Sequence, residues 1–217
     1  MLARTADHLF WLARYAERAE NTARLLEVGC QMALLPQSAR ALRLDWEGVL
    51  AINEQRLLFD ALQREKAQQK PQQTTQQAVL DFMVSEARNP SSIRTCWAAA
   101  RANAQAVRER LPTELWEVLN QTGLDVITHT QAQGLYAQDP LAFFAWIKQR
   151  AHWARGAAAG TMLRGEALQF MQLGALLERA DNTARLLDVR FHAAQAGGSE
   201  PALAHEEGDE IGRASCR

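Results

Sequence analysis

Residues 16–28 read AERAENTARLLEV, and residues 177–189 read LERADNTARLLDV. The two strings differ only at their first position and by Glu/Asp exchange at two others, and Glu17 aligns with Glu178. A repeat that serves packing alone keeps its apolar spacing and lets its exposed polar residues change. Here Glu, Arg, Asn and Thr all return, so the polar side chains are predicted to have a role in both copies.

Each copy is predicted to be helical, because it lacks Gly and Pro and places apolar residues at helical spacing. In the first copy Glu17, Asn21 and Arg24 line up on one face, and Glu20 precedes Arg24 by one turn, which suits an ion pair. The second copy repeats both features. The polar residues of the two copies form the candidate site: Glu17, Arg18, Glu20, Asn21, Arg24, Glu178, Arg179, Asp181, Asn182 and Arg185.

Two interpretations of this candidate site are open. Two helices of this pattern can face each other across a pseudo-two-fold axis, so that the Glu of each reaches the Arg of the other. The site is then a structural polar network that fixes the register of two packed helices. Alternatively, the site is a charged, hydrogen-bonding surface that meets a ligand or a partner protein.

Composition indicates one globular domain, or two repeats that share a core. The chain has 217 residues, of which 47% are apolar and 23% charged. A net charge of −1 gives no general attraction to nucleic acid or to an acidic membrane, and no apolar run reaches the length of a membrane span. The N-terminus predicts no signal peptide, and Cys30, Cys96 and Cys216 lack paired spacing. These features predict a cytoplasmic protein.

The chain shows no alternating strand pattern of useful length, which predicts an all-α, multi-helix bundle with an internal two-fold repeat. Thr5, a serine after Pro90, Thr113 and Asp139 are expected to cap helices. A turn is expected from Gly156 to Gly160. The predicted helices cover about residues 5–35, 40–64, 78–86, 93–110, 114–133, a segment after Pro140, and 166–196.

The last residues of the chain differ in composition from the predicted helical domain of residues 1–196. Residues 197–217 are mostly small and acidic without periodicity, so we expect a disordered tail. Residues 210–217 read EIGRASCR, which one reading frame of a common sequencing adapter encodes. We therefore expect these eight residues to be an artefact and the natural protein to continue.

Motifs for catalysis or metal binding are absent from the sequence. It contains no Glu-x-x-His, His-Glu-x-x-His, Gly-x-Ser-x-Gly or phosphate loop, and its five histidines are scattered. No metal, cofactor or catalytic residue is therefore predicted. Arg94, Arg101 and Arg108 recur every seven residues, for which a solvated helix face is a simpler explanation than a nucleic-acid surface. Cys96 and the six tryptophans are predicted to lie in the core.

Residues 2–24 resemble the start of the bacterial alpha-E domain family, a helical domain named for a Glu-Arg motif. Further matches are residues 89–93, 100–104, 114–120 and 178–181, so the resemblance covers essentially residues 1–192. Ala102 stands where the family usually has Glu. The family usually continues with helices that match those following the first motif, which implies that the second repeat is incomplete here.

The resemblance implies a companion of ATP-grasp-type ligases and transglutaminase-like proteins, in gene clusters thought to make or attach small peptides. Our leading hypothesis is a non-catalytic partner that docks the ligase or holds its peptide or amino acid, with the candidate site as its polar centre. Arg would bind carboxylates and Glu would accept from amines. Two alternatives are an enzyme of the same pathway with a buried Glu as acid/base, and a self-associating structural bundle. Neither a nucleic acid nor a membrane is expected as a partner.

Overall fold

The computed structural model describes residues 1–34, 46–67 and 74–197, and all regular elements in these ranges are helical. The predicted all-α fold is confirmed. The elements in chain order are α1 (Ala3–Ala33), α2 (Trp46–Ile52), α3 (Arg56–Ala67), α4 (Thr75–Val84), α5 (Ile93–Ala106), the 3-10 turn η2 (Arg108–Arg110), α6 (Thr113–His129), α7 (Leu135–Gln138), α8 (Pro140–Thr161) and α9 (Glu166–Gly197).

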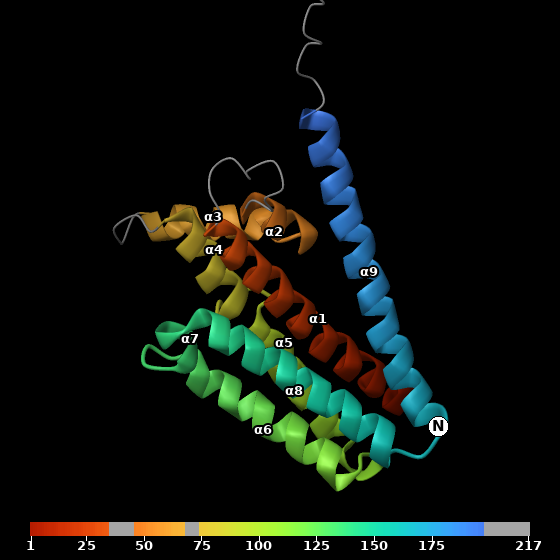
Figure 1. The fold of residues 1–217 in the computed structure, drawn as a ribbon. Helices are drawn as coiled ribbons and strands as arrows, with labels where there is room; N and C mark the ends of the chain where they lie inside the picture. The colour runs from red at the N-terminus through yellow and green to blue at the C-terminus, as the bar shows by residue number, and fades with distance from the viewer. Residues whose placement is uncertain (35–45, 68–73, 198–217) are drawn as a thin grey trace, which may run out of the picture.

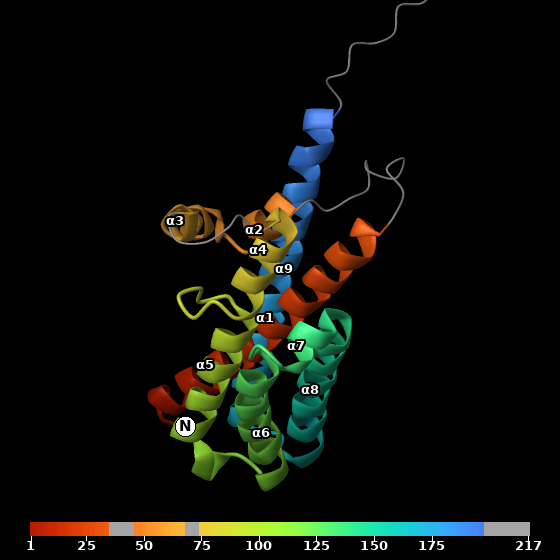
Figure 2. The same cartoon turned by 90° about the vertical axis from the view of Figure 1, so that its left-hand side faces the viewer.

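Helix α1 is the centre of the bundle and packs mainly against α9, α5 and α8 (Figure 1, Figure 2). Its apolar stripe is almost completely buried, since Leu9, Leu12, Ala19, Ala23 and Leu26 are at most 1% exposed. The alanines allow close approach of the neighbouring helices, and the leucines fill the remaining space. Full burial of one leucine side chain contributes about 1.5–3 kcal/mol, so this stripe is a major part of the core.

Helix α9 starts at the same end of the bundle as α1 and runs beside it (Figure 1). The amino group of Met1 donates to Glu166 Oε2 at 2.8 Å, which joins the two N-terminal ends. Further along the two helices, Gly174 of α9 permits a close approach to α1, because a Cβ at this position would collide with the carbonyl oxygen of Phe10. The two helices that carry the repeated string therefore lie side by side and run in the same direction.

The outer face of α9 is apolar and exposed to solvent. Its C-terminal turns extend past α2, α3 and α4 in both views (Figure 1, Figure 2). No helix of the described ranges is long and apolar enough to cross a membrane. The large apolar side chains exposed along α9 are Phe170, Leu173, Leu176, Leu177, Leu186, Leu187 and Phe191.

The single helix expected over residues 40–64 is wrong. In the part of this range that the structure describes, α2 ends at Ile52 and α3 begins at Arg56. Between them Glu54 adopts φ 54°, in the left-handed region that few non-glycine residues occupy. This local backbone geometry has no signature in the apolar spacing of the sequence, so the break was not predicted.

The turn expected at residues 156–160 is also wrong, because this segment lies inside α8. Each glycine in a helix costs about 1 kcal/mol relative to alanine, but tertiary packing overrides this preference. Ala151, Ala154 and Ala158 are buried on the inner face of α8, and their contacts keep the helix continuous. Thr5 does not cap α1 either, since the helix begins at Ala3 and its N-cap residue makes no side-chain cap hydrogen bond.

Two predicted N-caps are confirmed. Ser92 Oγ accepts from the backbone N–H of Thr95 at 3.2 Å, and Asp139 Oδ1 accepts from that of Ala142 at 3.0 Å. The long helix expected over residues 166–196 is present as α9. The expected tail of residues 197–217, with the adapter hypothesis, lies outside the described residues apart from Gly197, the last residue of α9.

Core predictions for single residues have mixed outcomes. Cys96 is fully buried as expected, and burial raises the pKa of its thiol to about 12, which makes it an unreactive apolar group. The expectation that all six tryptophans fill the core is wrong. Trp97 is fully buried, whereas Trp153 is 48% exposed and has the guanidinium of Arg150 over its ring.

Candidate functional site

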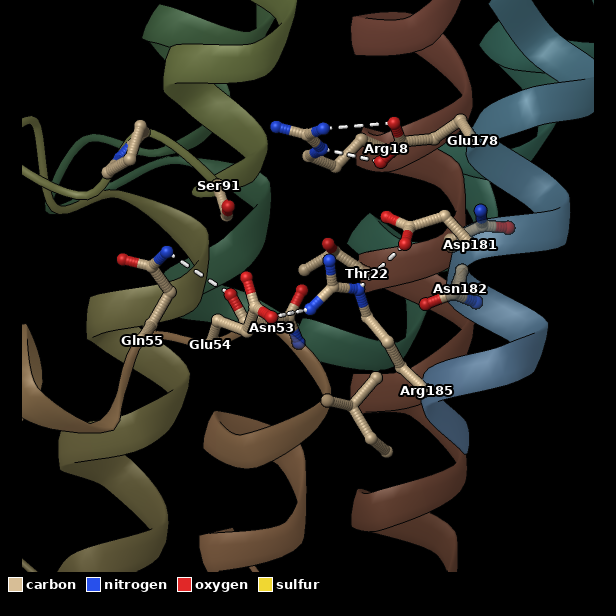
Figure 3. Close-up of a pocket in the computed structure, with 13 residues that line it drawn as sticks. Arg18, Thr22, Asn53, Glu54, Gln55, Ser91, Glu178, Asp181, Asn182 and Arg185 are labelled. Atoms are coloured by element: carbon tan, nitrogen blue, oxygen red, sulfur yellow. Dashed lines mark hydrogen bonds and ion pairs between the residues drawn. The ribbon is translucent and has the colours of Figure 1, made fainter. Parts of the chain in front are cut away.

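Reciprocal ion pairs join the two copies of the Glu-Arg dipeptide. Arg18 of α1 donates from Nε and Nη2 to the two carboxylate oxygens of Glu178 in α9, at 2.5 and 2.9 Å (Figure 3). Arg179 of α9 donates in the same way to Glu17 in α1, at 2.9 and 3.2 Å. The expectation that the Glu of each helix reaches the Arg of the other is met by these four hydrogen bonds.

Both carboxylates of this junction are buried, but their arginines differ in exposure. Glu17 and Glu178 are 3% and 4% exposed. The side chain of Arg18 is 24% exposed and that of Arg179 is 52% exposed. Arg14, which the sequence did not single out, also donates to Glu178, at 2.7 Å. Glu178 therefore has two arginine partners, Arg14 and Arg18, both from α1.

Arg155 of α8 connects this junction to a second buried carboxylate. It donates to Glu17 Oε2 at 3.1 Å and to Glu20, which is 2% exposed. Glu20 also accepts from Arg24 at 2.6 and 3.0 Å, which confirms the predicted pair one helical turn apart. No motif marked Arg155 in the sequence, because it lies in the segment expected to lead into a turn.

Two of the charged groups in this network have shifted pKa values that favour their ionised state, Glu20 and Arg18. Burial alone raises the pKa of Glu20, but the hydrogen bonds from Arg155 and Arg24 outweigh this effect and leave the pKa lowered. Burial likewise lowers the pKa of Arg18, and the hydrogen bonds and charge of Glu178 outweigh it, so that the pKa is raised. Glu20 and Arg18 are consequently both charged at neutral pH.

A polar cavity of about 180 Å³ opens beside the Arg18–Glu178 pair (Figure 3). It lies between α1, α9, the turn between α2 and α3, and the segment before α5. Its walls contain Asn21 and Thr22 of the first copy and Asp181, Asn182 and Arg185 of the second. The remaining lining residues are Arg18, Ile52, Asn53, Glu54, Gln55, Pro90, Ser91 and Glu178.

Two residues that line this cavity carry a buried polar atom with no hydrogen-bond partner among the described residues: Asn21 Nδ2 and Thr22 Oγ1. On the opposite side, Arg185 donates to Asp181 Oδ1 at 3.1 Å, as predicted for residues one turn apart, and also forms an ion pair with Glu54. An unpaired buried donor destabilises the protein by about 1–3 kcal/mol, so such atoms need a compensating role.

A second cavity, of about 220 Å³, lies on the other side of the junction and is mostly apolar. Glu17 and Arg155 stand at its edge, and its walls come from α1, α6, α8 and α9. Alanine side chains and Leu12, Leu115, Leu119, Leu168 and Met171 form most of its surface. Because it carries few polar groups, it has little means to orient a ligand.

The predicted site residues therefore fall into separate environments. Glu17, Asn21 and Arg24 share one face of the continuous helix α1, as predicted. Their surroundings differ, because Glu17 borders the apolar cavity, Asn21 borders the polar cavity, and Arg24 is half exposed beside Glu20. The residues of α1 that share the polar cavity are Arg18, Asn21 and Thr22. Thr22 was not among the candidates, although its return as Thr183 in the second copy was a signal for it.

The arrangement is suited to binding rather than to proton transfer. Both oxygens of Glu17 and of Glu178 accept from arginine, so arginine already occupies the oxygens that a general acid/base would present to a substrate. Within the described ranges, no group of three or more His, Cys, Asp or Glu residues could hold a metal ion.

The fold and the site define a class of protein: an all-α bundle whose repeated Glu-Arg helices are joined by reciprocal ion pairs beside a polar cavity. The chain matches the Alpha-E family model, described as a predicted alpha-helical domain with a conserved ER motif, over residues 1–211. It belongs to this family. No curated protein and no solved structure matches it. Of its Glu-Arg dipeptides, those at residues 17–18 and 178–179 form the junction, whereas the one at residues 109–110 is exposed in η2.

Proposed function

We propose that this chain is a non-catalytic accessory protein that acts with an ATP-grasp-type peptide or amide ligase in small-peptide synthesis or tagging. The observation that carries the proposal is the polar cavity, which both copies of the repeat line and where two buried polar atoms lack partners. The Glu-Arg pairs would hold the two helices in place, and the cavity between them would hold the ligand that the ligase uses or makes.

The enzyme alternative receives less support from this geometry. A buried Glu that acts as a general acid/base needs a pKa near the working pH and an oxygen within reach of the substrate. The arginine partners of Glu17 and Glu178 occupy both oxygens of each carboxylate. Turnover of an amino acid or peptide by the chain alone, lost in Glu17→Gln, would reverse this preference.

The test is the reaction of an ATP-grasp-type ligase encoded next to the gene, or next to that of a family relative. ATP consumption and peptide product are measured with increasing amounts of the chain. We expect the rate to rise and to saturate near an equimolar ratio, and the two proteins to co-elute. Without either effect the proposal fails.

A matched pair of variants links this effect to the cavity. Glu54→Gln changes a carboxylate at the cavity, whereas Glu47→Gln changes a carboxylate that pairs with Arg56 on the surface. Both glutamates are exposed, so neither variant should alter folding. We expect only Glu54→Gln to reduce stimulation of the ligase. Equal stimulation by the two variants would mean that the cavity is not needed for stimulation of the ligase.

A second candidate function, self-association, is favoured by the outer face of α9. Its exposed leucines and Phe191 form a longer apolar stripe than the scattered apolar residues of an ordinary surface. Light scattering over a range of concentrations tests this candidate, with Leu187→Asp as the variant that places a charge in the stripe. A monomer at all concentrations would exclude self-association through this face.

A further inference from the structure

Helix α1 contributes three hydrogen-bond donors to the lining of the polar cavity. Arg18, Asn21 and Thr22 stand at positions i, i+3 and i+4 of α1, so they share one face. Thr22 is 2% exposed, and its Oγ1 has no partner among the described residues; the same holds for the buried Nδ2 of Asn21. These atoms can compensate their burial by binding an oxygen of a ligand.

Arg18 adds a charged donor to this face. Its Nε and Nη2 donate to Glu178, and Figure 3 shows the third guanidinium nitrogen pointing away from that carboxylate. Glu178 also accepts from Arg14, so two guanidinium groups share one carboxylate. This end of the cavity therefore has an excess of positive charge.

The opposite end of the cavity has the reverse balance. Asp181 of α9 and Glu54 of the turn between α2 and α3 both form ion pairs with the single guanidinium of Arg185 (Figure 3). Arg14 lies 3.9 Å from Asp181 and contributes only weakly there. One guanidinium thus faces two carboxylates, which leaves acceptor oxygens and an excess of negative charge.

Backbone strain at Glu54 supports a functional role for the end of the cavity that contains Glu54 and Asp181. Its φ of 54° is unfavourable for a residue with a side chain, and such strain persists where the surrounding structure or a function requires it. The strained turn carries the Glu54 carboxylate to the edge of the cavity, where it meets Arg185.

We propose that this cavity binds a small α-amino acid as its zwitterion. Its carboxylate would accept from Arg18, Asn21 and Thr22, and its ammonium group would donate to Asp181 and Glu54. The cavity volume of about 180 Å³ suits one small molecule of this kind. The inference rests on the proposed function and specifies the class of substrate that the accessory protein would hold.

The test is a titration of the full 217-residue chain with L-alanine, followed by calorimetry or by NMR chemical shifts. N-acetylalanine lacks the ammonium group, and alaninamide lacks the carboxylate. We expect saturable binding of alanine in the millimolar range, and binding at least about tenfold weaker for each derivative, since tenfold corresponds to about 1.4 kcal/mol for a lost polar contact. The dipeptide Ala-Ala distinguishes the source of the zwitterion: tighter binding than alanine would assign the site to a peptide.

Thr22→Val and Thr183→Val form a matched pair, because the two threonines occupy the same position of the repeat. Thr22 lines the cavity, whereas Thr183 is exposed and donates to the carbonyl of Arg179 at 2.7 Å. We expect Thr22→Val to weaken alanine binding about tenfold while the protein stays folded, since Oγ1 has no partner to lose. Thr183→Val should bind as the unchanged chain does.

Three results would overturn the inference: no saturable binding of alanine up to about 50 mM, equal binding of alanine and its derivatives, or no effect of Thr22→Val. Its failure is distinguishable from failure of the proposed function. If the ligase is stimulated but alanine does not bind, the amino-acid assignment alone is wrong. If alanine binds and the ligase does not respond, the site remains and the ligase partnership is wrong.

Discussion

Helices α1 and α9 carry almost the same thirteen residues but have different surroundings. Leu12 and Leu26 of α1 are 1% and 0% exposed, because α5 and α8 cover their side of the helix. The equivalent residues of α9, Leu173 and Leu187, are 47% and 65% exposed. The same local sequence thus forms the same helix in both places, while its apolar face is buried only where other helices cover it.

The polar residues of the two strings behave differently from the apolar ones. Glu17 and Glu178 are buried to the same extent, and each accepts two hydrogen bonds from the arginine of the opposite string. The junction between the two helices thus explains why the same polar residues occur in both copies of the repeat. Of the apolar residues in the second copy, Val189 packs against the core, whereas Leu177, Leu186 and Leu187 are exposed within the described part of the chain.

Charge substitutions in the apolar stripe should give the largest difference between the two helices. Leu26→Asp places an unpaired carboxylate in the core, and we expect a loss of at least about 4 kcal/mol in the free energy of unfolding. Leu187→Asp lies on the exposed face and should change it by no more than about 0.5 kcal/mol. Urea unfolding followed by circular dichroism measures both; similar losses would mean that the face of α9 is covered in solution.

Charge reversal of Arg18 and of Arg179 should give a smaller difference in the free energy of unfolding between α1 and α9. Arg18→Glu places a second carboxylate against the buried Glu178, which we expect to cost about 3–5 kcal/mol. Arg179→Glu should cost less, because the side chain of Arg179 is half exposed and water can screen the repulsion from Glu17. The double variant Arg18→Glu/Glu178→Arg should recover part of the loss.

This experiment also discriminates between the two interpretations of the candidate site. Loss of folding in Arg18→Glu, with recovery in the double variant, supports the structural network. Retained helicity and stability with loss of ligand or ligase binding would instead mean that Arg18 serves recognition alone.

The sequence predicted the all-α fold, since helical periodicity is a local signal, and offered contact between the two strings as one of two interpretations. It did not predict Arg155 or Arg14, because neither belongs to a repeated or spaced pattern. The cavity residue Glu54 was also missed. Its position depends on a left-handed backbone angle between two helices that the apolar spacing presented as one.

Acid should remove a contribution of Glu20 to stability. Its pKa is lowered in the folded protein, so this contribution is complete above the unfolded pKa, near 4.3, and decreases as the pH falls through the folded value. Glu20→Gln should therefore lower the free energy of unfolding at pH 7 by about 1–3 kcal/mol. The difference between this variant and the unchanged chain should shrink below about pH 4. Urea unfolding at pH 7 and at about pH 3 measures it; a difference independent of pH would contradict an ionised Glu20.

Asp181→Asn, at the equivalent position of α9, should have the smallest effect. The side chains of Asp181 and Arg185 are 39% and 32% exposed, so water screens their ion pair and limits its contribution to about 0.5 kcal/mol. Glu20 has the same place in its string but is enclosed by Arg24 and Arg155, which is why its loss should matter more at pH 7. A urea midpoint for Asp181→Asn close to that of the unchanged chain, beside a clear decrease for Glu20→Gln, would show that burial and not sequence sets the strength of the repeated pair. Equal decreases would mean that Asp181 is as enclosed as Glu20.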